Sequence, residues 1–127
     1  LYWARYLGLL DGQMASQVYA VFYQLLETVS VEEIYGIVLD FRDVKRFDRT
    51  NLTATRQESR TLNKTYDLSR IPVAMLVKNL MQEQFVKISS KITGTEHRVR
   101  IVWTEEEMRA FFSNFHASLA AQPKEQD

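Results

Sequence analysis

Residues 35–52 read YGIVLDFRDVKRFDRTNL, and this stretch decides the fold. Residues 36–41 are apolar with almost no polar interruption, which is typical of a strand buried on both faces. Charged residues of both signs follow. Asp48 or Thr50 can then cap a helix that runs to about Tyr66, because either side-chain oxygen can accept from the free N–H groups of a first helical turn. The stretch therefore predicts a central strand, its polar carboxyl end and the start of a helix.

The residues before this strand predict a hairpin followed by a helix. Residues 2–10 are rich in aromatic side chains and leucine, and Asp11-Gly12 is a dipeptide that favours the positive φ angles of a two-residue hairpin turn. We expect residues 13–15 to form a short return strand. From Ser16 onward, apolar residues recur at steps of three and four, which predicts an amphipathic helix capped by Ser16.

A second buried strand and another helix follow. Residues 71–72 are Ile-Pro, and the next five, VAMLV at 73–77, predict the strand. Asn79 is placed to cap a helix that Gly94 ends. Apolar residues repeat along this helix at four-three-four spacing, so its buried stripe should consist of Met81, Phe85, Ile88 and Ile92.

The last strand and helix complete the pattern. Apolar residues at 99, 101 and 103 alternate with arginines, which predicts a strand with one wet face or an edge position. Thr104 and Glu107 have the spacing of a capping box, so the final helix begins there. Its buried stripe should consist of Met108, Phe111, Phe112, Phe115 and Leu119.

The whole chain is expected to form one α/β domain. It has 127 residues, 46% hydrophobic and 25% charged, which is the composition of an ordinary globular domain. The domain should span residues 1–119, with a flexible tail at 120–127. Alternating strands and helices with short links form largely parallel sheets. We therefore predict a mixed sheet of about five strands, made by an N-terminal hairpin and three βα units, packed with about four helices.

Composition argues against several classes of protein. There is no cysteine, so disulfides and thiolate metal sites are excluded, and a cytoplasmic setting fits best. The apolar runs are far shorter than the roughly 20 residues that a transmembrane helix needs, so no membrane span is expected. The 16 basic and 16 acidic residues cancel, which leaves little of the phosphate-driven affinity that nucleic-acid-binding proteins use.

No pattern of catalytic or metal-binding residues stands out, and we expect a non-enzymatic protein without metal or cofactor. His97 and His116 lie far apart, and neither neighbours a nucleophile or zinc motif. Asp40, Asp43 and Asp48 lie near the carboxyl end of the central strand, where ligands bind in open α/β sheets. A magnesium site would need carboxylates from other strand ends as well. Turn and capping roles are therefore favoured for these three residues.

The helix after the central strand carries the best functional lead. Four basic residues share one of its faces, at steps of seven, four and four: Arg49, Arg56, Arg60 and Lys64. Arg46 precedes them. Like charges four residues apart on a helix repel each other by roughly 0.2–0.5 kcal/mol. The row therefore indicates a site for an anion or an acidic partner, or else a solvated face relieved by acids such as Glu58 and Asp67.

Four segments carry a family resemblance: LDFRDV at 39–44, FDRTNL at 47–52, IPVAMLV at 71–77 and RVRIVWTEEEMRAFF at 98–112. Together they resemble the STAS / SpoIIAA-like family, named for sulphate transporters and anti-sigma-factor antagonists. The last segment is similar to the ending of small bacterial SpoIIAA-like proteins of unknown function, a group described alongside CRAL-TRIO lipid-binding domains. The resemblance covers nearly the whole chain and implies a SpoIIAA-like fold with a regulatory or protein-interaction role.

The resemblance also implies a degenerate phospho-switch at the turn before the basic helix. In the anti-sigma antagonists this turn resembles D-S-S-G-L, and a partner kinase phosphorylates a serine there. Residues 48–52 here read DRTNL, so only the first and last positions match and Thr50 keeps one hydroxyl. Asp48 and Thr50 are thus the candidate phosphoacceptor turn, and a plain helix-capping role for Thr50 is the competing interpretation.

Two functions follow from these patterns. The leading one is a non-enzymatic, STAS-like regulatory domain of a bacterial cytoplasm that presents the basic helix and its turn to a protein partner. The alternative is a carrier or sensor of a lipid or small apolar anion in an internal cavity under the last two helices. Their Met and Phe side chains could also bury a helix face in a homodimer: Met81, Phe85, Phe111, Phe112 and Phe115.

Overall fold

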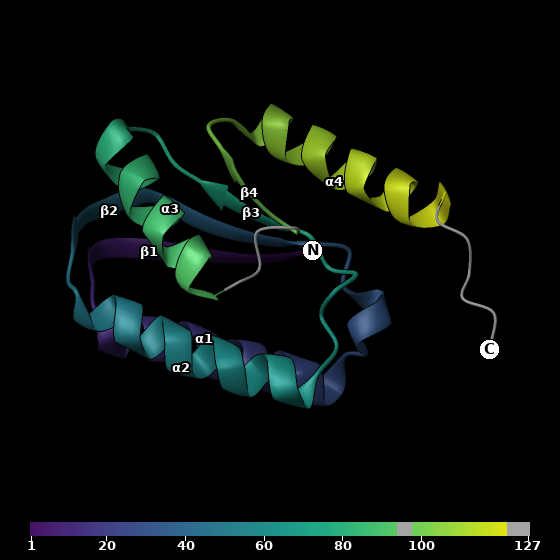
Figure 1. The fold of residues 1–127 in the computed structure, drawn as a ribbon, viewed down its shortest axis with the longest axis horizontal. Coiled ribbons are helices and arrows are strands. Elements are labelled where there is room, and N and C mark those ends of the chain that lie inside the picture. Colours follow the sequence, from purple (N-terminus) through teal and green to yellow (C-terminus); the bar gives the residue numbers. More distant parts are fainter. Residues whose placement is uncertain (94–97, 122–127) are drawn as a thin grey trace.

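Four parallel strands in sequential order β1-β2-β3-β4 form the centre of the protein (Figure 1). The computed structural model describes residues 1–93 and 98–121. β2 is the longest strand and pairs with β1 on one side and with β3 on the other, which confirms its central place. The strands are β1 (Tyr2–Leu10), β2 (Ile37–Phe47), β3 (Val73–Leu76) and β4 (Val99–Val102).

Helices cover both faces of this sheet unequally. Figure 1 shows α1 and α2 side by side on one face and α4 on the other. α3 packs beside α2 and on strands β2 and β4. α4 packs mainly on β3 and β4, and Val38 of β2 also belongs to the apolar cluster beneath it. The helices are α1 (Gly12–Thr28), α2 (Thr50–Thr65), α3 (Leu80–Thr93) and α4 (Glu105–Ala121), and a 3₁₀ turn at Val31–Glu33 leads into β2.

The predicted N-terminal hairpin is wrong. Asp11 caps α1 instead of starting a turn, since its Oδ1 accepts the Met14 N–H at 3.0 Å. Residues 13–15 and Ser16 therefore lie inside the helix, and Gly12 does not adopt a positive φ. The described sheet has four strands where about five were expected, and it is parallel where a mixed sheet was expected. An Asp-Gly pair suits an N-cap as well as a hairpin turn, and here it caps a helix.

One glycine of β1 does adopt the left-handed conformation. Gly8 has a φ of 67° and lies where the β1–β2 register shifts before Leu9. Such an irregularity re-aims the strand and strongly favours glycine. A second register shift lies between Arg5 and Leu7.

The face covered by α4 has a dense apolar core. Three strands and the helix supply its buried side chains, of which Phe111 is 8% exposed and six are at most 1% exposed: Val38, Ala74, Leu76, Val102, Met108 and Phe112. Half of the predicted capping box is present, because the Glu107 N–H donates to Thr104 Oγ1 at 3.1 Å, while the Glu107 carboxylate accepts the Trp103 N–H at 3.2 Å and not that of Thr104. Of the predicted stripe, Met108, Phe111 and Phe112 are buried, while the other two positions are half-buried.

The predicted buried stripe of α3 is wrong. Met81 and Ile88 are 48% and 51% exposed, whereas Gln82 is fully buried. The Gln82 amide donates to the carbonyls of Arg42 at 3.2 Å and Val44 at 3.0 Å. β3 ends at Leu76, so this part of β2 has no neighbouring strand on the β3 side, and a buried polar group must find a partner. The helix therefore turns its polar edge inward.

Other predictions for this region have mixed outcomes. Asn79 caps α3 as expected, since its Oδ1 accepts the Gln82 N–H at 2.9 Å. Gly94, His97 and residues 122–127 of the tail lie outside the described residues, as does the side chain of Ile92. In the described part of the chain, no helix combines the length and apolar composition needed to span a bilayer.

Candidate functional site

α2 is polar on both its buried and its exposed face. Small polar side chains at steps of four point toward the sheet, and Asn51, Thr55 and Ser59 are all 9% exposed or less. Leu62 continues this face into the apolar core next to α1. The Thr55 hydroxyl donates to Asn51 Oδ1 at 3.2 Å. The scarcity of apolar residues that the sequence shows in this helix therefore has a structural counterpart, a polar wall inside the protein.

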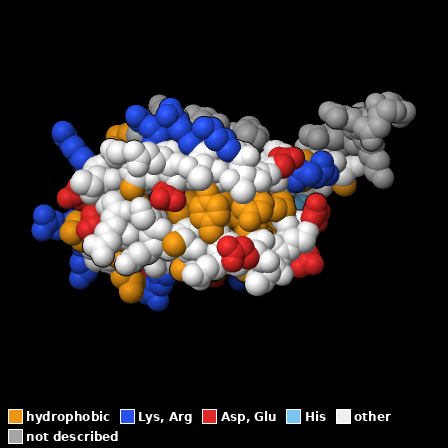
Figure 2. Space-filling model, turned by 90° about the horizontal axis from the view of Figure 1, so that it is seen from below, with side chains coloured by type: hydrophobic (Ala, Val, Ile, Leu, Met, Phe, Trp, Pro, Cys, Tyr) orange, Lys and Arg blue, Asp and Glu red, His pale blue; other side chains and the backbone are white. Residues whose placement is uncertain are grey.

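The outer face of α2 carries the predicted basic row. Figure 2 shows it as a line of Lys and Arg side chains along one edge of the view. None of these side chains, nor Arg46, forms an ion pair with any residue that the structure describes. All five are exposed: Arg46, Arg49, Arg56, Arg60 and Lys64. We call this set the basic face.

The acids that were expected to relieve the basic face do not pair with it. Glu58 lies near Tyr19 and Tyr23 of α1, where its charge adds to burial in raising the pKa of both hydroxyls. Asp67 follows the helix and accepts the Ser69 N–H at 3.1 Å. A hydrogen bond with the Ser69 side chain, and then this backbone bond, lower the pKa of Asp67. The cations of the basic face are therefore available to bind an anionic group from outside the described chain.

The turn before α2 joins the starts of two helices. Neither Asp48 nor Thr50 occupies the N-cap position of α2, which is Arg49 and makes no side-chain cap hydrogen bond. Asp48 Oδ1 nevertheless accepts the Thr50 N–H and the Thr50 hydroxyl, both at 2.9 Å, so it satisfies one free N–H of the first turn. These hydrogen bonds lower the pKa of Asp48. Gly12 is the first residue of α1, and its N–H donates to the Thr50 Oγ1 at 2.9 Å. The Thr50 hydroxyl thus links the turn before α2 to the first residue of α1.

A cavity of about 100 Å³ lies between the sheet and helices α1, α2 and α3. One wall is the polar inner face of α2. The floor comes from the strands and includes Tyr6, Phe41 and Met75, and α3 adds Phe85 and Ser89. Of the five Met and Phe side chains that were expected to line a cavity under the last two helices, only Phe85 lines this one. The cavity thus borders α3 as expected, but its other helical walls are α1 and α2 and not α4.

A buried cation lines this cavity. Arg98 directly precedes β4 and is only 6% exposed. Its Nη1 donates to the Ile71 carbonyl at 3.2 Å, and no carboxylate among the described residues lies within ion-pair distance. Burial lowers the pKa of Arg98, against the opposing influence of Tyr19 and Asp67. Burying a charge without a paired counter-charge lowers the stability of a protein. The presence of Arg98 at a buried position therefore points to a functional role.

Tyr19 of α1 also lines the cavity and is close enough to Arg98 to interact with it electrostatically. Burial raises its pKa to about 12, while a hydrogen bond with Ser59 and the charge of Arg98 act in the opposite direction. Burial likewise raises the pKa of Tyr6 on the floor. Both phenols therefore stay protonated at neutral pH. They supply hydroxyl groups and not charge to the cavity.

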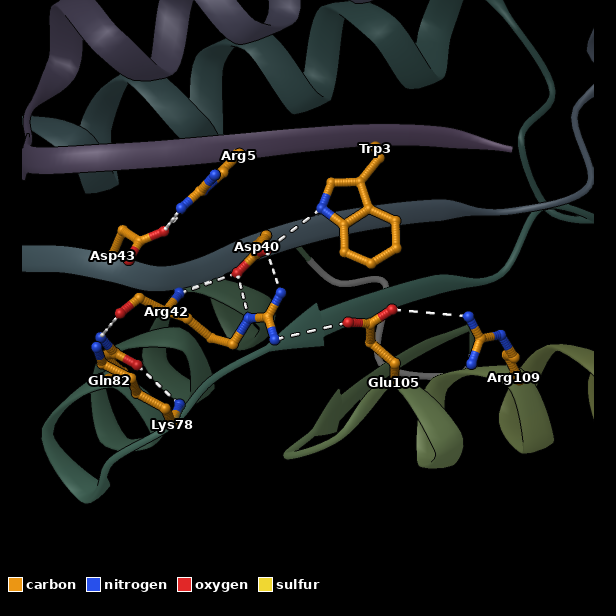
Figure 3. Close-up of polar contacts among 9 residues, drawn as sticks. All are labelled: Trp3, Arg5, Asp40, Arg42, Asp43, Lys78, Gln82, Glu105 and Arg109. Atoms are coloured by element: carbon orange, nitrogen blue, oxygen red, sulfur yellow. Dashed lines mark hydrogen bonds and ion pairs between the residues drawn. The ribbon is translucent and has the colours of Figure 1, made fainter.

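The acidic residues of β2 form structural contacts on the other face of the sheet (Figure 3). Asp40 is 1% exposed and accepts from Arg42 Nη2 at 2.9 Å and from Trp3 Nε1 at 3.3 Å. Asp43 pairs with Arg5. Burial alone would raise the pKa of Asp40, but its hydrogen bonds to Arg42 and Trp3 and the Arg42 charge outweigh burial and lower it. Across the described residues, no group of acids or histidines converges as a metal site would require.

Sequence reasoning found the basic face, placed the cavity under α3 and α4 where the structure has it against α1, α2 and α3, and missed Arg98. The four-residue repeat of small polar residues in α2 was a signal for a polar wall, since a helix normally buries apolar side chains. No such signal marks Arg98, because it alternates with apolar residues just as Arg100 does. His116 contacts the Tyr35 carbonyl through Nε2 at 2.6 Å and stacks on the Tyr35 ring, which gives it a structural role.

The chain matches no protein-family model and no curated protein.

Proposed function

We propose that this protein is a non-enzymatic, STAS-like regulatory domain of a bacterial cytoplasm that binds an acidic protein surface through the basic face of α2. One observation carries the proposal: five exposed cations lie on and just before one helix without an ion-pair partner in the described chain. An acidic partner would relieve their mutual repulsion. Complementary charge also accelerates encounter and selects among partners.

The framework of α2 suits this role. The helix packs against α1, and its inner side is buried, so the basic face is held in a fixed orientation on the sheet. A preorganised surface loses less conformational entropy on binding than a flexible one does. Zero net charge over the chain means that attraction depends on the local arrangement of charges, which favours a partner of defined shape over a polyanion such as nucleic acid.

Thr50 is the proposed control point of this surface. A phosphate there would lie at the start of α2 beside Arg49, and the neighbouring start of α1 is held to the Thr50 hydroxyl by the Gly12 N–H. Helix N-termini and arginines both favour added negative charge. Phosphorylation would also replace the hydroxyl that donates to Asp48 and set two anions against each other. The turn would thereby change shape next to the basic face.

The test is partner capture with charge-reversed variants. Arg56→Glu with Arg60→Glu reverses two charges in the middle of the basic face. A matched control, Lys78→Glu with Arg109→Glu, reverses two exposed cations outside it. We expect nuclease-treated lysate of the source cells to yield at least one protein that the wild type and the control retain and that the basic-face variant loses by tenfold or more. Equal capture by all three proteins would refute the proposal.

A further inference from the structure

Arg98 has more hydrogen-bonding capacity than the described chain uses. A guanidinium carries five N–H donors in a planar fork. The structure gives the side chain one acceptor, the Ile71 carbonyl, at 3.2 Å. The nearby acid Asp67 is exposed and does not come within ion-pair distance. The buried cation therefore lines a cavity with donors that an entering anion can use.

The surroundings of Arg98 define what kind of anion fits. Tyr19 and Ser59 bring hydroxyl groups to the same end of the cavity. The floor is apolar and aromatic, formed by Leu39, Phe41, Met75 and Val99. A complementary ligand has a planar anionic head and a short apolar body. A carboxylate matches a guanidinium through two parallel hydrogen bonds, so it suits this head position.

The volume of the cavity limits the size of the ligand. A cavity of about 150 Å³ holds benzene, which has six non-hydrogen atoms. The cavity here is about 100 Å³, which by the same proportion encloses about four such atoms, and because it is partly open to solvent, a ligand of about six such atoms can extend beyond it. A lipid acyl chain is much larger. The cavity therefore supports a small-molecule site and not the lipid carrier that was considered from the sequence.

We propose that the cavity under α2 binds a small monocarboxylate with a short alkyl chain, and that the Arg98 guanidinium holds its carboxylate. Tyr19 and Ser59 complete the polar end, and the strands of the sheet hold the alkyl chain. This site lies on the inner side of α2, so it does not depend on the partner surface proposed for the outer side.

Butyrate and butyramide make a matched pair of probes, because they have nearly the same shape and differ in charge. We would titrate each into isotopically labelled protein at pH 7 and follow backbone amide shifts by NMR, with sodium chloride holding the ionic strength constant. We expect butyrate to bind at about 1 mM or below and at least tenfold more tightly than butyramide, with the largest shifts at Thr55, Ser59 and Val99. Equal affinities, or no butyrate-specific shift up to about 50 mM, would overturn the proposal.

Variants locate the binding site. Arg98→Met should reduce butyrate affinity tenfold or more, while Arg100→Met, two residues further along in β4 and over the Phe111 ring of α4, should leave it unchanged. Ser59→Leu keeps Arg98 and fills the cavity, so it should abolish binding even if Arg98→Met does not fold. Unchanged affinity in Ser59→Leu would place the ligand elsewhere and refute the site. The Arg56→Glu, Arg60→Glu protein should bind butyrate normally, which separates this test from the test of partner binding.

Discussion

The two faces of the sheet are built on different principles. The α4 face is filled by apolar side chains such as Leu76, Met108 and Phe112, each at most 1% exposed. The face under α1, α2 and α3 has an apolar floor but a polar wall, a buried arginine and a cavity of about 100 Å³. A tightly filled core contributes stability, whereas a polar cavity costs stability and offers binding capacity. The α4 face therefore serves stability alone, whereas the other face combines two apolar clusters with a polar cavity that can bind a ligand.

The largest effect on stability should come from removing a buried side chain on the α4 face. Phe112 is 1% exposed, and its ring lies so close to Gly36 that a Cβ there would approach it to 2.8 Å. Phe112→Ala should lower the free energy of unfolding by about 3–5 kcal/mol, because it removes a buried ring and leaves a void. Urea denaturation measures the change.

Phe85→Ala is the matched substitution on the other face. The Phe85 ring is half-buried, stacks on Phe47 at 3.9 Å between centroids and lines the cavity. Because much of its surface is already free of close packing, we expect a cost of about 1–2 kcal/mol, below the range for fully buried rings. Similar losses for the two variants would show that the two faces contribute equally to stability.

The next effect concerns the ion pair on the α4 side of β2. Asp40→Asn leaves Arg42 without its carboxylate, and Arg42 is 35% exposed, so water can partly replace the lost partner. We expect a loss of about 1–3 kcal/mol at pH 7, less than for a fully buried pair. Denaturation of the variant and the wild type under identical conditions gives the difference.

The same pair predicts a dependence on pH. The pKa of Asp40 is lower in the folded protein than in the unfolded chain, where it is about 3.9. Its contribution to stability is therefore present above pH 4 and disappears as the pH falls through the lower folded pKa. The stability difference between the wild type and Asp40→Asn should shrink between pH 5 and the acid limit of folding. A difference that stays constant over that range would contradict the ionic role of Asp40.

Adding volume tests the packing contrast directly. Ala74→Val enlarges a fully buried residue on the α4 face and should cost about 1–3 kcal/mol through overpacking. Ser59→Val enlarges a buried residue beside the cavity, where space is present, so its cost should stay below about 1 kcal/mol. A larger loss in the free energy of unfolding for Ser59→Val than for Ala74→Val would contradict the proposed difference in packing between the two faces.

The sequence predicted the positions of helices and strands better than it predicted the contacts between them. β2, β3, β4 and α4 follow from apolar runs, alternation and a capping box, which are local signals. The Asp11-Gly12 pair misled because its local pattern fits a hairpin turn and a helix cap equally well. The orientation of α3 was unpredictable for another reason, since Gln82 is turned inward by β2 carbonyls that lie 38 and 40 residues away in the chain. The basic face was predictable because a single helix contains its spacing, whereas Arg98 meets α1 and α2 only in the folded chain.

The smallest effect should come from the basic face, because its charges are exposed. Arg60→Ala removes repulsion from Arg56 and Lys64, which lie four residues away on either side. We expect a gain in stability of about 0.2–0.5 kcal/mol at low salt. The gain should nearly vanish in about 1 M salt, where charges are screened beyond roughly 3 Å. Denaturation of wild type and variant at the two salt concentrations measures it. A loss of stability at low salt would mean that Arg60 has an attractive partner, and it would remove the unrelieved charge on which the proposed partner surface rests.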